Sequence, residues 1–322
     1  MIRNKSLDSL RGLAIIFVLI AHYFSNGIGY DGVTLLLGKY DINFGFIGRL
    51  GVILFFLLSG FLIISSLQKN SNIFVFYKKR FLRIYPPYLF SIVIVALISF
   101  FVTILHIKYD LFTYMANIFM VQDLVGSKLI NGVYWTLLLE IKFYFFIPII
   151  FILNKYLKRD ILEYLFYLMI ILNIFIYFYR GYASTLLIWE PIFFLGIYLY
   201  RFFSNEISLN KLMGVFFIYM IYIEIVDSIE MSLFILFNFI LFYTFYKFRI
   251  NNFILNFFGK ISYSLYLLHT VVSYPLLYIM SKYWCDYCLF LKIMIVLIVS
   301  LVLSMLSNFY IENIYFKKKG NS

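Results

Sequence analysis

The chain has 322 residues, of which 64% are hydrophobic, and its mean hydropathy is +0.95. This composition excludes an ordinary soluble globular protein and predicts an integral membrane protein. The formal net charge of +12 suggests a nucleic-acid partner at first sight. However, the basic residues recur in short segments between long apolar runs, which is typical of loops between membrane spans. We therefore expect no nucleic acid among its partners.

Apolar runs of membrane-spanning length follow one another along the chain with short polar breaks. They predict an all-α fold, a polytopic membrane bundle of about ten transmembrane helices. Because no long polar segment interrupts the series, we expect residues 1–322 to form a single membrane domain without a separate soluble domain. The expected spans are Leu7–Phe24, Phe46–Leu67, Pro86–His106, Val133–Asn154, Ile161–Tyr179, Ser184–Tyr200, Leu212–Ile225, Met231–Tyr246, Ile261–Met280 and Leu289–Tyr310.

The basic residues are unevenly divided between the two ends of these spans. One side receives most of them, and by the positive-inside rule that side is cytoplasmic, together with both termini. The segment 109–130 is apolar in part, but making it a span would reverse every later loop. We expect it to be an external loop with an interfacial or re-entrant piece. The basic residues left on the outer side are Lys39, Arg49, Lys108, Lys128, Arg180 and Lys282.

The first span carries three polar residues that are costly in a bilayer, Asp8, Arg11 and His22. Arg11 and His22 are eleven residues apart, almost a whole number of helical turns, so they share one stripe of the helix. At 1.5 Å per residue the stripe spans about 16 Å. A polar stripe from one surface toward the other indicates a functional site. The start is not expected to be a cleaved signal peptide, because charges interrupt it.

Before the third span, the segment FYKKRFLRIYPPYL gathers basic residues at the expected cytoplasmic surface. Arg80 and Arg83 are one helical turn apart, so their guanidinium groups can converge on one anion such as phosphate. For Lys78 and Lys79 we favour contact with lipid headgroups or simple topology charge. Pro86 and the following proline are expected to begin the span.

Further polar residues occur inside the fourth, sixth and ninth expected spans. Glu140 lies about two turns from the outer end of its span, with Tyr144 one turn further on the same face. Such a carboxylate requires a partner, and His22 lies at a comparable depth; a structural ion pair is the alternative. Glu190 precedes a proline whose kink can free backbone groups to line a cavity. In the ninth span the residues on one helical face are Ser262, Tyr266 and His269.

The two cysteines, Cys285 and Cys288, are too few for a zinc site, so no metal is expected. We attribute their proximity to chance, with an external disulfide as the alternative.

Five segments in this order resemble the acyltransferase-3 family of integral-membrane acyltransferases. They are LDSLRGLAIIFVLIAH, GVILFFLLSGFLI, RFLRIYPPY, WTLLLEIKFYFFIPI and GKISYSLYLLH. The resemblance implies about ten spans and transfer of an acyl group, usually acetyl, from cytoplasmic acyl-CoA. The implied acceptor is a hydroxyl of a cell-envelope or surface carbohydrate, or of a lipid-linked sugar, at a bacterial plasma membrane. Some relatives carry an added esterase-like domain that is not seen here, so the need for a separate extracytoplasmic partner stays open.

The resemblance also assigns roles to individual residues. It implies that His22 and Glu140 are catalytic and that Arg11, Arg80 and Arg83 bind the donor. We expect His22 to act as a general base, with a transient acyl carrier as the alternative, and Glu140 to orient the imidazole. The polar path for substrate is expected to include Asp8, Tyr144, Glu190, Ser262, Tyr266 and His269. The competing functions are a polysaccharide or lipid-linked-sugar transporter and a non-catalytic sensor.

Overall fold

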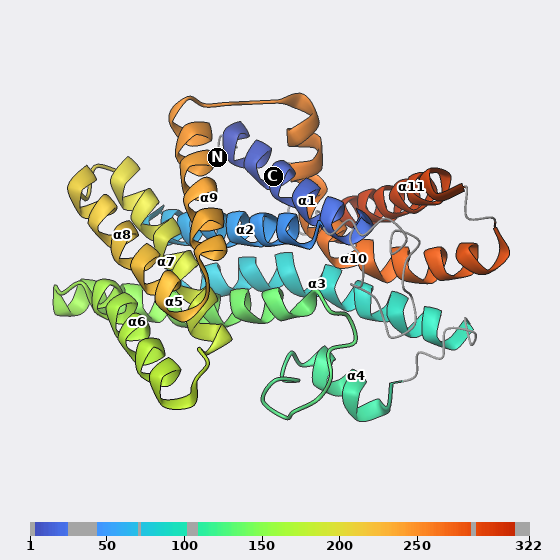
Figure 1. The fold of residues 1–322 in the computed structure, drawn as a ribbon, viewed down its shortest axis with the longest axis horizontal. Helices are drawn as coiled ribbons and strands as arrows, with labels where there is room; N and C mark the ends of the chain where they lie inside the picture. The colour runs from blue at the N-terminus through green and yellow to red at the C-terminus, as the bar shows by residue number, and fades with distance from the viewer. Residues whose placement is uncertain (1–3, 25–43, 70–71, 102–108, 285–287, 313–322) are drawn as a thin grey trace. The chain divides into compact units, whose positions relative to one another are not determined.

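The computed structural model describes residues 4–24, 44–69, 72–101, 109–284 and 288–312. Every regular element in these residues is a helix, and eleven α-helices follow one another along the chain (Figure 1). Ten helices are long and apolar enough to cross a membrane, which confirms the predicted number of spans. The helices are α1 (Lys5–Phe24), α2 (Gly45–Lys69), α3 (Ile73–Phe101), α4 (Leu111–Ile118), α5 (Tyr134–Leu157), α6 (Ile161–Arg180), α7 (Thr185–Phe203), α8 (Leu209–Val226), α9 (Ile229–Lys247), α10 (Phe253–Tyr283) and α11 (Leu289–Ser307).

The predicted start of the third span at Pro86 is wrong. Helix α3 begins at Ile73, because the side-chain oxygen of Asn72 accepts hydrogen bonds from the backbone amides of Phe74 and Val75, at 3.1 and 3.2 Å. Asparagine is a strong helix cap, and here it outweighs the tendency of proline to begin a helix. Both prolines therefore lie inside the helix, and the basic segment before them is helical. The predicted end of this span, His106, lies outside the described residues.

The predicted start of the ninth span also differs from the structure, whereas the prediction for segment 109–130 holds in part. Helix α10 begins at Phe253, two turns before the predicted Ile261, so the span extends through the polar residues Asn256 and Lys260. The segment 109–130 contains only the eight-residue helix α4, which is not among the candidate spans. Its predicted exclusion from the membrane-crossing helices is therefore confirmed. Its position outside the membrane stays a prediction.

The chain divides into two compact units whose boundaries fall inside α1, α2, α3, α5 and α10. The first unit comprises Met1–Ala14, Arg49–Tyr77 and Leu137–Asn256, and the second comprises Ile15–Gly48, Lys78–Thr136 and Phe257–Ser322. Helices α6 to α9 belong wholly to the first unit, where α6 packs on α7 and α8, and α8 packs on α7 and α9 (Figure 1).

Close backbone contact joins α2 to α7 in the first unit. A Cβ atom at Gly60 would lie 1.9 Å from the carbonyl oxygen of Phe193, and one at Gly196 would lie 2.2 Å from that of Leu57. Lipid chains are as apolar as the side chains, so the hydrophobic effect does not drive helices together inside a membrane. Helices there usually approach closely where they carry small residues. The aromatic ring of Phe193 then stacks on Phe56 at a centroid distance of 4.2 Å. Gly60 and Gly196 therefore pack α2 closely against α7.

In the second unit, one asparagine closes the loop that follows α4. The Asn117 side chain donates hydrogen bonds to the carbonyl oxygens of Thr113 and Lys128, both at 2.9 Å, and accepts one from the amide of Ile130. The Tyr88 hydroxyl of α3 donates to the carbonyl oxygen of Asn117 at 2.8 Å. These bonds satisfy buried polar groups of a loop that would otherwise be costly to bury. They hold the loop against α3 and lead the chain into α5.

Candidate active site

His22 lies in the last turn of α1 with its ring held by the helix backbone. Its Nδ1 atom lies 2.9 Å from the carbonyl oxygen of Val18, one turn earlier. Because a carbonyl oxygen can only accept, Nδ1 must carry a proton and donate it. In the neutral ring the other nitrogen, Nε2, then holds the free lone pair. The helix itself therefore selects the tautomer in which Nε2 can act as a base or nucleophile.

A second histidine on α10 lies beside the first. The ring centroids of His22 and His269 are 4.8 Å apart and the ring planes are inclined by 75°. His269 is completely buried, and its Nδ1 atom lies 3.0 Å from the carbonyl oxygen of Leu265 and 2.8 Å from that of Tyr266. This Nδ1 also donates, so Nε2 again holds the lone pair. Within the described residues, that Nε2 has no hydrogen-bond partner.

Glu140, on α5, is held by two hydroxyl groups of the first unit. Its Oε1 atom accepts a hydrogen bond of 2.5 Å from Ser59 of α2 and another from the Tyr144 hydroxyl, one turn further along α5. Tyr144 also lies within 3.3 Å of the Ser59 hydroxyl. Such donors stabilise a carboxylate in an apolar helix bundle. The Val18 carbonyl oxygen accepts from Nδ1 of His22, and the predicted role of Glu140 in orienting the imidazole stays a prediction.

The two arginines of the predicted donor site differ in exposure from the neighbouring lysines. Arg80 and Arg83 are half-buried on α3, whereas Lys78 and Lys79 are exposed. Since Arg80 and Arg83 are separated by three residues in a continuous helix, they share one face. Pro86 and Pro87 lack amide donors, so the helix leaves the carbonyl oxygens of Leu82 and Arg83 without their usual partners. This part of α3 therefore carries both charged side chains and backbone carbonyl groups that lack the usual helical hydrogen bond.

Arg11 forms an ion pair within α1. Its Nη1 atom lies 3.3 Å from Oδ1 of Asp8, and the two side chains are only 17% and 5% exposed. Pairing allows both charges to stay inside a membrane-spanning helix. Helix α1 is continuous from Lys5 to Phe24, so the predicted stripe that carries Arg11 and His22 lies on one unbroken helix. The role of Arg11 in donor binding stays a prediction.

Tyr266 and Ser262 differ in what they contact. The Tyr266 hydroxyl bonds to the hydroxyl of Thr136 at 2.5 Å and donates to the carbonyl oxygen of Val133 at 3.2 Å, so it links α10 to the start of α5. Its ring centroid lies 5.9 Å from that of His269. Ser262 is buried and donates to the carbonyl oxygen of Gly259 within its own helix. Tyr266 therefore borders the histidine pair, and Ser262 is satisfied locally.

The comparison with known protein families decides what kind of protein carries this arrangement. The acyltransferase-3 family model, described as an acyltransferase domain, matches residues 4–309. The chain belongs to the acyltransferase-3 family. It is thus a multi-pass membrane protein of an acyltransferase family, as the sequence motifs predicted.

Two relatives share parts of this acyltransferase chain. It is 35% identical over 131 residues to ORF330 of Acidianus two-tailed virus, which is provisionally described as an acetyltransferase. The aligned stretch covers 40% of this chain and 37% of the relative. It is 30% identical over 99 residues to the acyltransferase MdmB of Streptomyces mycarofaciens. This second aligned stretch covers 31% of this chain and 25% of the relative. The aligned stretches thus span about a third and a quarter of these relatives. No solved structure matches.

The backbone group freed by the proline next to Glu190 has a hydrogen-bond partner, and the place of Glu190 on the substrate path stays a prediction. Pro191 removes the amide that would bond to the carbonyl oxygen of Leu187, but the Tyr222 hydroxyl of α8 donates to that oxygen at 2.8 Å. Glu190 itself is buried, and the Lys142 ammonium acts on it electrostatically. The freed backbone group is therefore satisfied by a tyrosine, and Glu190 has a basic neighbour on α5.

Several polar residues near the histidines were not predicted. Tyr23 donates to the hydroxyl of Ser300 on α11 at 3.0 Å, and its ring lies 6.4 Å from that of His269. Asn131 accepts a bond from Thr270 at 2.9 Å and donates to the carbonyl oxygen of Leu267 at 3.3 Å. These residues brace both sides of the His269 turn. Isolated hydroxyl and amide residues carry no sequence pattern, so only the fold reveals them.

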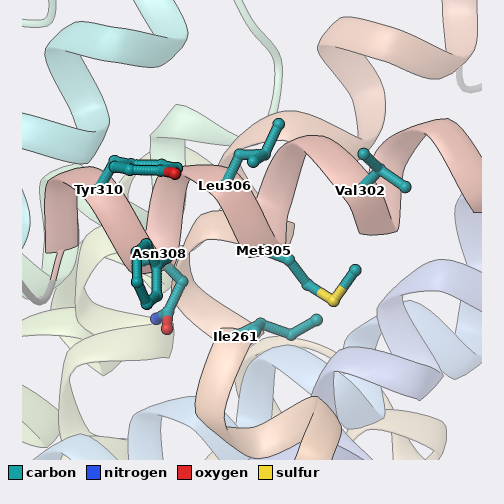
Figure 2. Close-up of a pocket in the computed structure, with 7 residues that line it drawn as sticks. Ile261, Val302, Met305, Leu306, Asn308 and Tyr310 are labelled. Carbon is teal, nitrogen blue, oxygen red and sulfur yellow. The ribbon is translucent and has the colours of Figure 1, made fainter.

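An apolar pocket between α10 and the end of α11 lies elsewhere in the second unit. It has a volume of about 400 Å³, and Figure 2 shows Met305 and Ile261 side by side at its edge. None of the predicted site residues lines it, and it lacks a base. In the described part of the chain, no three His, Cys, Asp or Glu residues gather as metal ligands. Cys285 lies outside the described residues. The apolar pocket is further lined by Val302, Leu306, Asn308, Phe309 and Tyr310.

Proposed function

We propose that this protein is a membrane O-acyltransferase that moves an acetyl group from cytoplasmic acetyl-CoA to a hydroxyl group of a cell-envelope or surface carbohydrate. The observation that carries the proposal is the bond from His22 Nδ1 to the Val18 carbonyl, which leaves Nε2 as the basic nitrogen. In a chain of an acyltransferase family, such a nitrogen is suited to take the proton of an attacking hydroxyl.

The chemistry requires one base and one donor site. His22 Nε2 accepts the proton of the acceptor hydroxyl while the hydroxyl oxygen attacks the thioester carbonyl carbon. The carbon–sulfur bond then breaks, and the proton on His22 passes to the departing thiolate of CoA. The same Nε2 is also the atom on which a transient acyl group would form if His22 attacked the thioester directly. In both routes the reaction depends on Nε2.

The donor site is proposed at Arg80 and Arg83. The phosphates of CoA require cationic groups, and guanidinium groups bind phosphate oxygens in pairs. The half-buried state of both arginines, next to exposed Lys78 and Lys79, supports a defined site over a generic surface charge. Their position on the cytoplasmic side follows from the positive-inside rule.

The acetyl group, the carbohydrate acceptor and the bacterial plasma membrane are proposed together. The provisional acetyltransferase description of the viral relative supports acetyl as the group transferred. The family resemblance supports a hydroxyl of an envelope carbohydrate or a lipid-linked sugar as acceptor. Membrane lipid surrounds the protein, and a separate extracytoplasmic protein is a candidate partner that completes delivery.

The test uses purified protein in lipid vesicles with radioactive acetyl-CoA and envelope polysaccharide from a strain in which the gene is deleted. We expect base-labile radioactive ester in the polysaccharide and release of one thiol per ester. A transporter, the main alternative, would move sugar across vesicles that contain no acetyl-CoA and would form no ester. That result would overturn the proposed function.

A further inference from the structure

The apolar pocket between α10 and the end of α11 takes no part in the proposed transfer chemistry. Its volume is about 400 Å³, and Ile261 of α10 faces Met305 of α11 at its edge (Figure 2). Ligand pockets typically measure about 300–1,000 Å³, so the volume suits part of a small molecule or one hydrocarbon chain. The lining and the surroundings of the pocket indicate which kind of molecule it takes.

The wall of the pocket that follows α11 is exposed and apolar. Val302, Leu306 and Phe309 are 44%, 47% and 56% exposed, respectively. All three lie in the segment Phe290–Glu312, which is long and apolar enough to cross a membrane. Exposed apolar side chains of a membrane span contact lipid chains instead of water. The molecules next to this pocket are therefore phospholipids.

Hydrogen bonds hold the wall of the pocket in place at the end of α11. The chain there forms one π-helical turn, Asn308–Glu312. The Asn308 amide, which lines the pocket, donates to the carbonyl oxygen of Lys260 at 3.0 Å and to Oε2 of Glu312 at 2.8 Å. Ser264 of α10 donates to the same Oε2 at 3.1 Å. The π-helical turn is thus fixed to α10, and the pocket is preformed.

A basic residue lies beside the polar end of the pocket. The bond from Asn308 to the Lys260 carbonyl oxygen places the Lys260 backbone next to the lining. The Lys260 side chain is exposed, and its ammonium group forms no hydrogen bond or ion pair within the described residues. A lysine near a helix end can extend its aliphatic stem to the membrane surface. By the positive-inside rule this surface is cytoplasmic, where anionic lipids attract basic side chains.

We propose that this pocket binds an anionic phospholipid of the cytoplasmic leaflet. One acyl chain lies against Ile261 and Met305, and the headgroup lies beside Lys260. The apolar lining accepts a chain of any phospholipid, so the lysine provides the selectivity for negative charge. A lysine at an anionic membrane surface contributes about fivefold to binding. This lipid site is independent of the proposed acyl transfer.

The experiment uses the full chain in detergent micelles with phosphatidylglycerol that carries a photoreactive diazirine in one acyl chain. After irradiation, mass spectrometry identifies the residues that carry the lipid. We expect more adducts on Met305 and Leu306 than on Phe175 of α6, which is 67% exposed and represents general lipid contact. Unlabelled phosphatidylglycerol should displace the probe at a concentration about fivefold lower than phosphatidylcholine with the same chains.

Two variants separate the headgroup from the chain. Lys260→Ala should bring the two competing phospholipids within about twofold of each other, because the selective charge is lost. Lys69→Ala, at an exposed position at the end of α2, is its control and should keep the wild-type preference. Met305→Trp should fill the pocket and remove the excess of adducts on Leu306. Leu291→Trp, at an exposed position of α11 outside the pocket, should leave that excess unchanged.

The inference is overturned if wild-type adducts on Met305 and Leu306 are no more frequent than on Phe175, as they would be if a second copy of the chain covered this face. Equal competition by both phospholipids in wild type, or an unchanged preference in Lys260→Ala, would also overturn it. If Met305→Trp does not fold, the wild-type competition and Lys260→Ala decide. None of these measurements requires acetyl transfer, so the lipid site and the proposed function can fail separately.

Discussion

The hydroxyl of Ser59 donates a 2.5 Å hydrogen bond to the carboxylate of Glu140 and so connects α2 to α5. Tyr144 donates to the same oxygen, which gives this intramembrane carboxylate two neutral donors. A buried carboxyl group needs such hydrogen bonds in an apolar bundle. The two bonds fix the Glu140 side chain between α2 and α5.

Glu140→Gln tests whether the carboxyl group of Glu140 is needed for acetyl transfer. Because the amide oxygen can still accept from Ser59 and Tyr144, we expect normal folding and acetyl-CoA binding but a loss of acetyl transfer of about tenfold or more. Ester formation in vesicles measures the effect. Glu230→Gln, at an exposed position on α9, is the matched control and should behave as wild type. Full activity of Glu140→Gln would remove Glu140 from the catalytic residues.

Arg80→Ala and Arg83→Ala should each weaken acetyl-CoA binding, measured by equilibrium binding to protein in nanodiscs. Each removes a charge-assisted contact to phosphate, so we expect a loss of about tenfold or more in affinity. Lysine at either position should restore little, because it lacks the planar fork. The exposed neighbour supplies the control, as Lys78→Ala should change binding less than twofold. Equal effects of all three alanine variants would show that the site is only generic positive charge.

Gly60→Ala tests the close contact of α2 and α7. The added methyl group would lie 1.9 Å from the Phe193 carbonyl oxygen, which is backbone and cannot move aside cheaply. Overpacking of this kind typically costs about 1–3 kcal/mol, so we expect a lower melting temperature in detergent. Gly214→Ala on α8 is the control, because nothing lies within 4 Å of its new methyl group. An unchanged melting temperature of Gly60→Ala would contradict the packing described here.

The sidedness of the protein can be tested across a single helix. Lys128 lies in the loop before α5, and Arg159 lies just after it. With Cys285 and Cys288 replaced by serine, Lys128→Cys should react with an impermeant maleimide on intact cells, and Arg159→Cys only after permeabilisation. Labelling of both from the same side would show that α5 does not cross the membrane. The reverse pattern would place both termini outside.

The sequence predicted the ten spans because their signal is local: an apolar run of sufficient length crosses a bilayer wherever it occurs. It failed at the start of α3, since the capping by Asn72 outweighed the two prolines. It also did not show that the hydroxyl of Tyr222 satisfies the carbonyl freed by Pro191. That contact joins residues distant in the chain, and a single sequence does not show such pairs.

The candidate site shows the same division between local and distant information. The tautomer of His22 depends on Val18, one turn away, and so is already implied by helix geometry. By contrast, the neighbour of His22 is His269, in another helix near the opposite end of the chain. The sequence led us to expect His269 on the polar path that serves His22, but the direct contact of the two rings appears only in the fold.

The central claim is that His22 provides the nitrogen on which acyl transfer depends, and His22→Ala in vesicles tests it most directly. The measurement is the rate of ester formation from acetyl-CoA, with acetyl-CoA binding and expression as checks on folding. His106→Ala is the control histidine variant and should match wild type. We predict that His22→Ala lowers the rate by about 10²–10⁴-fold while still binding acetyl-CoA, as expected for loss of a general base. A folded, donor-binding His22→Ala protein with a near-wild-type rate would contradict the account.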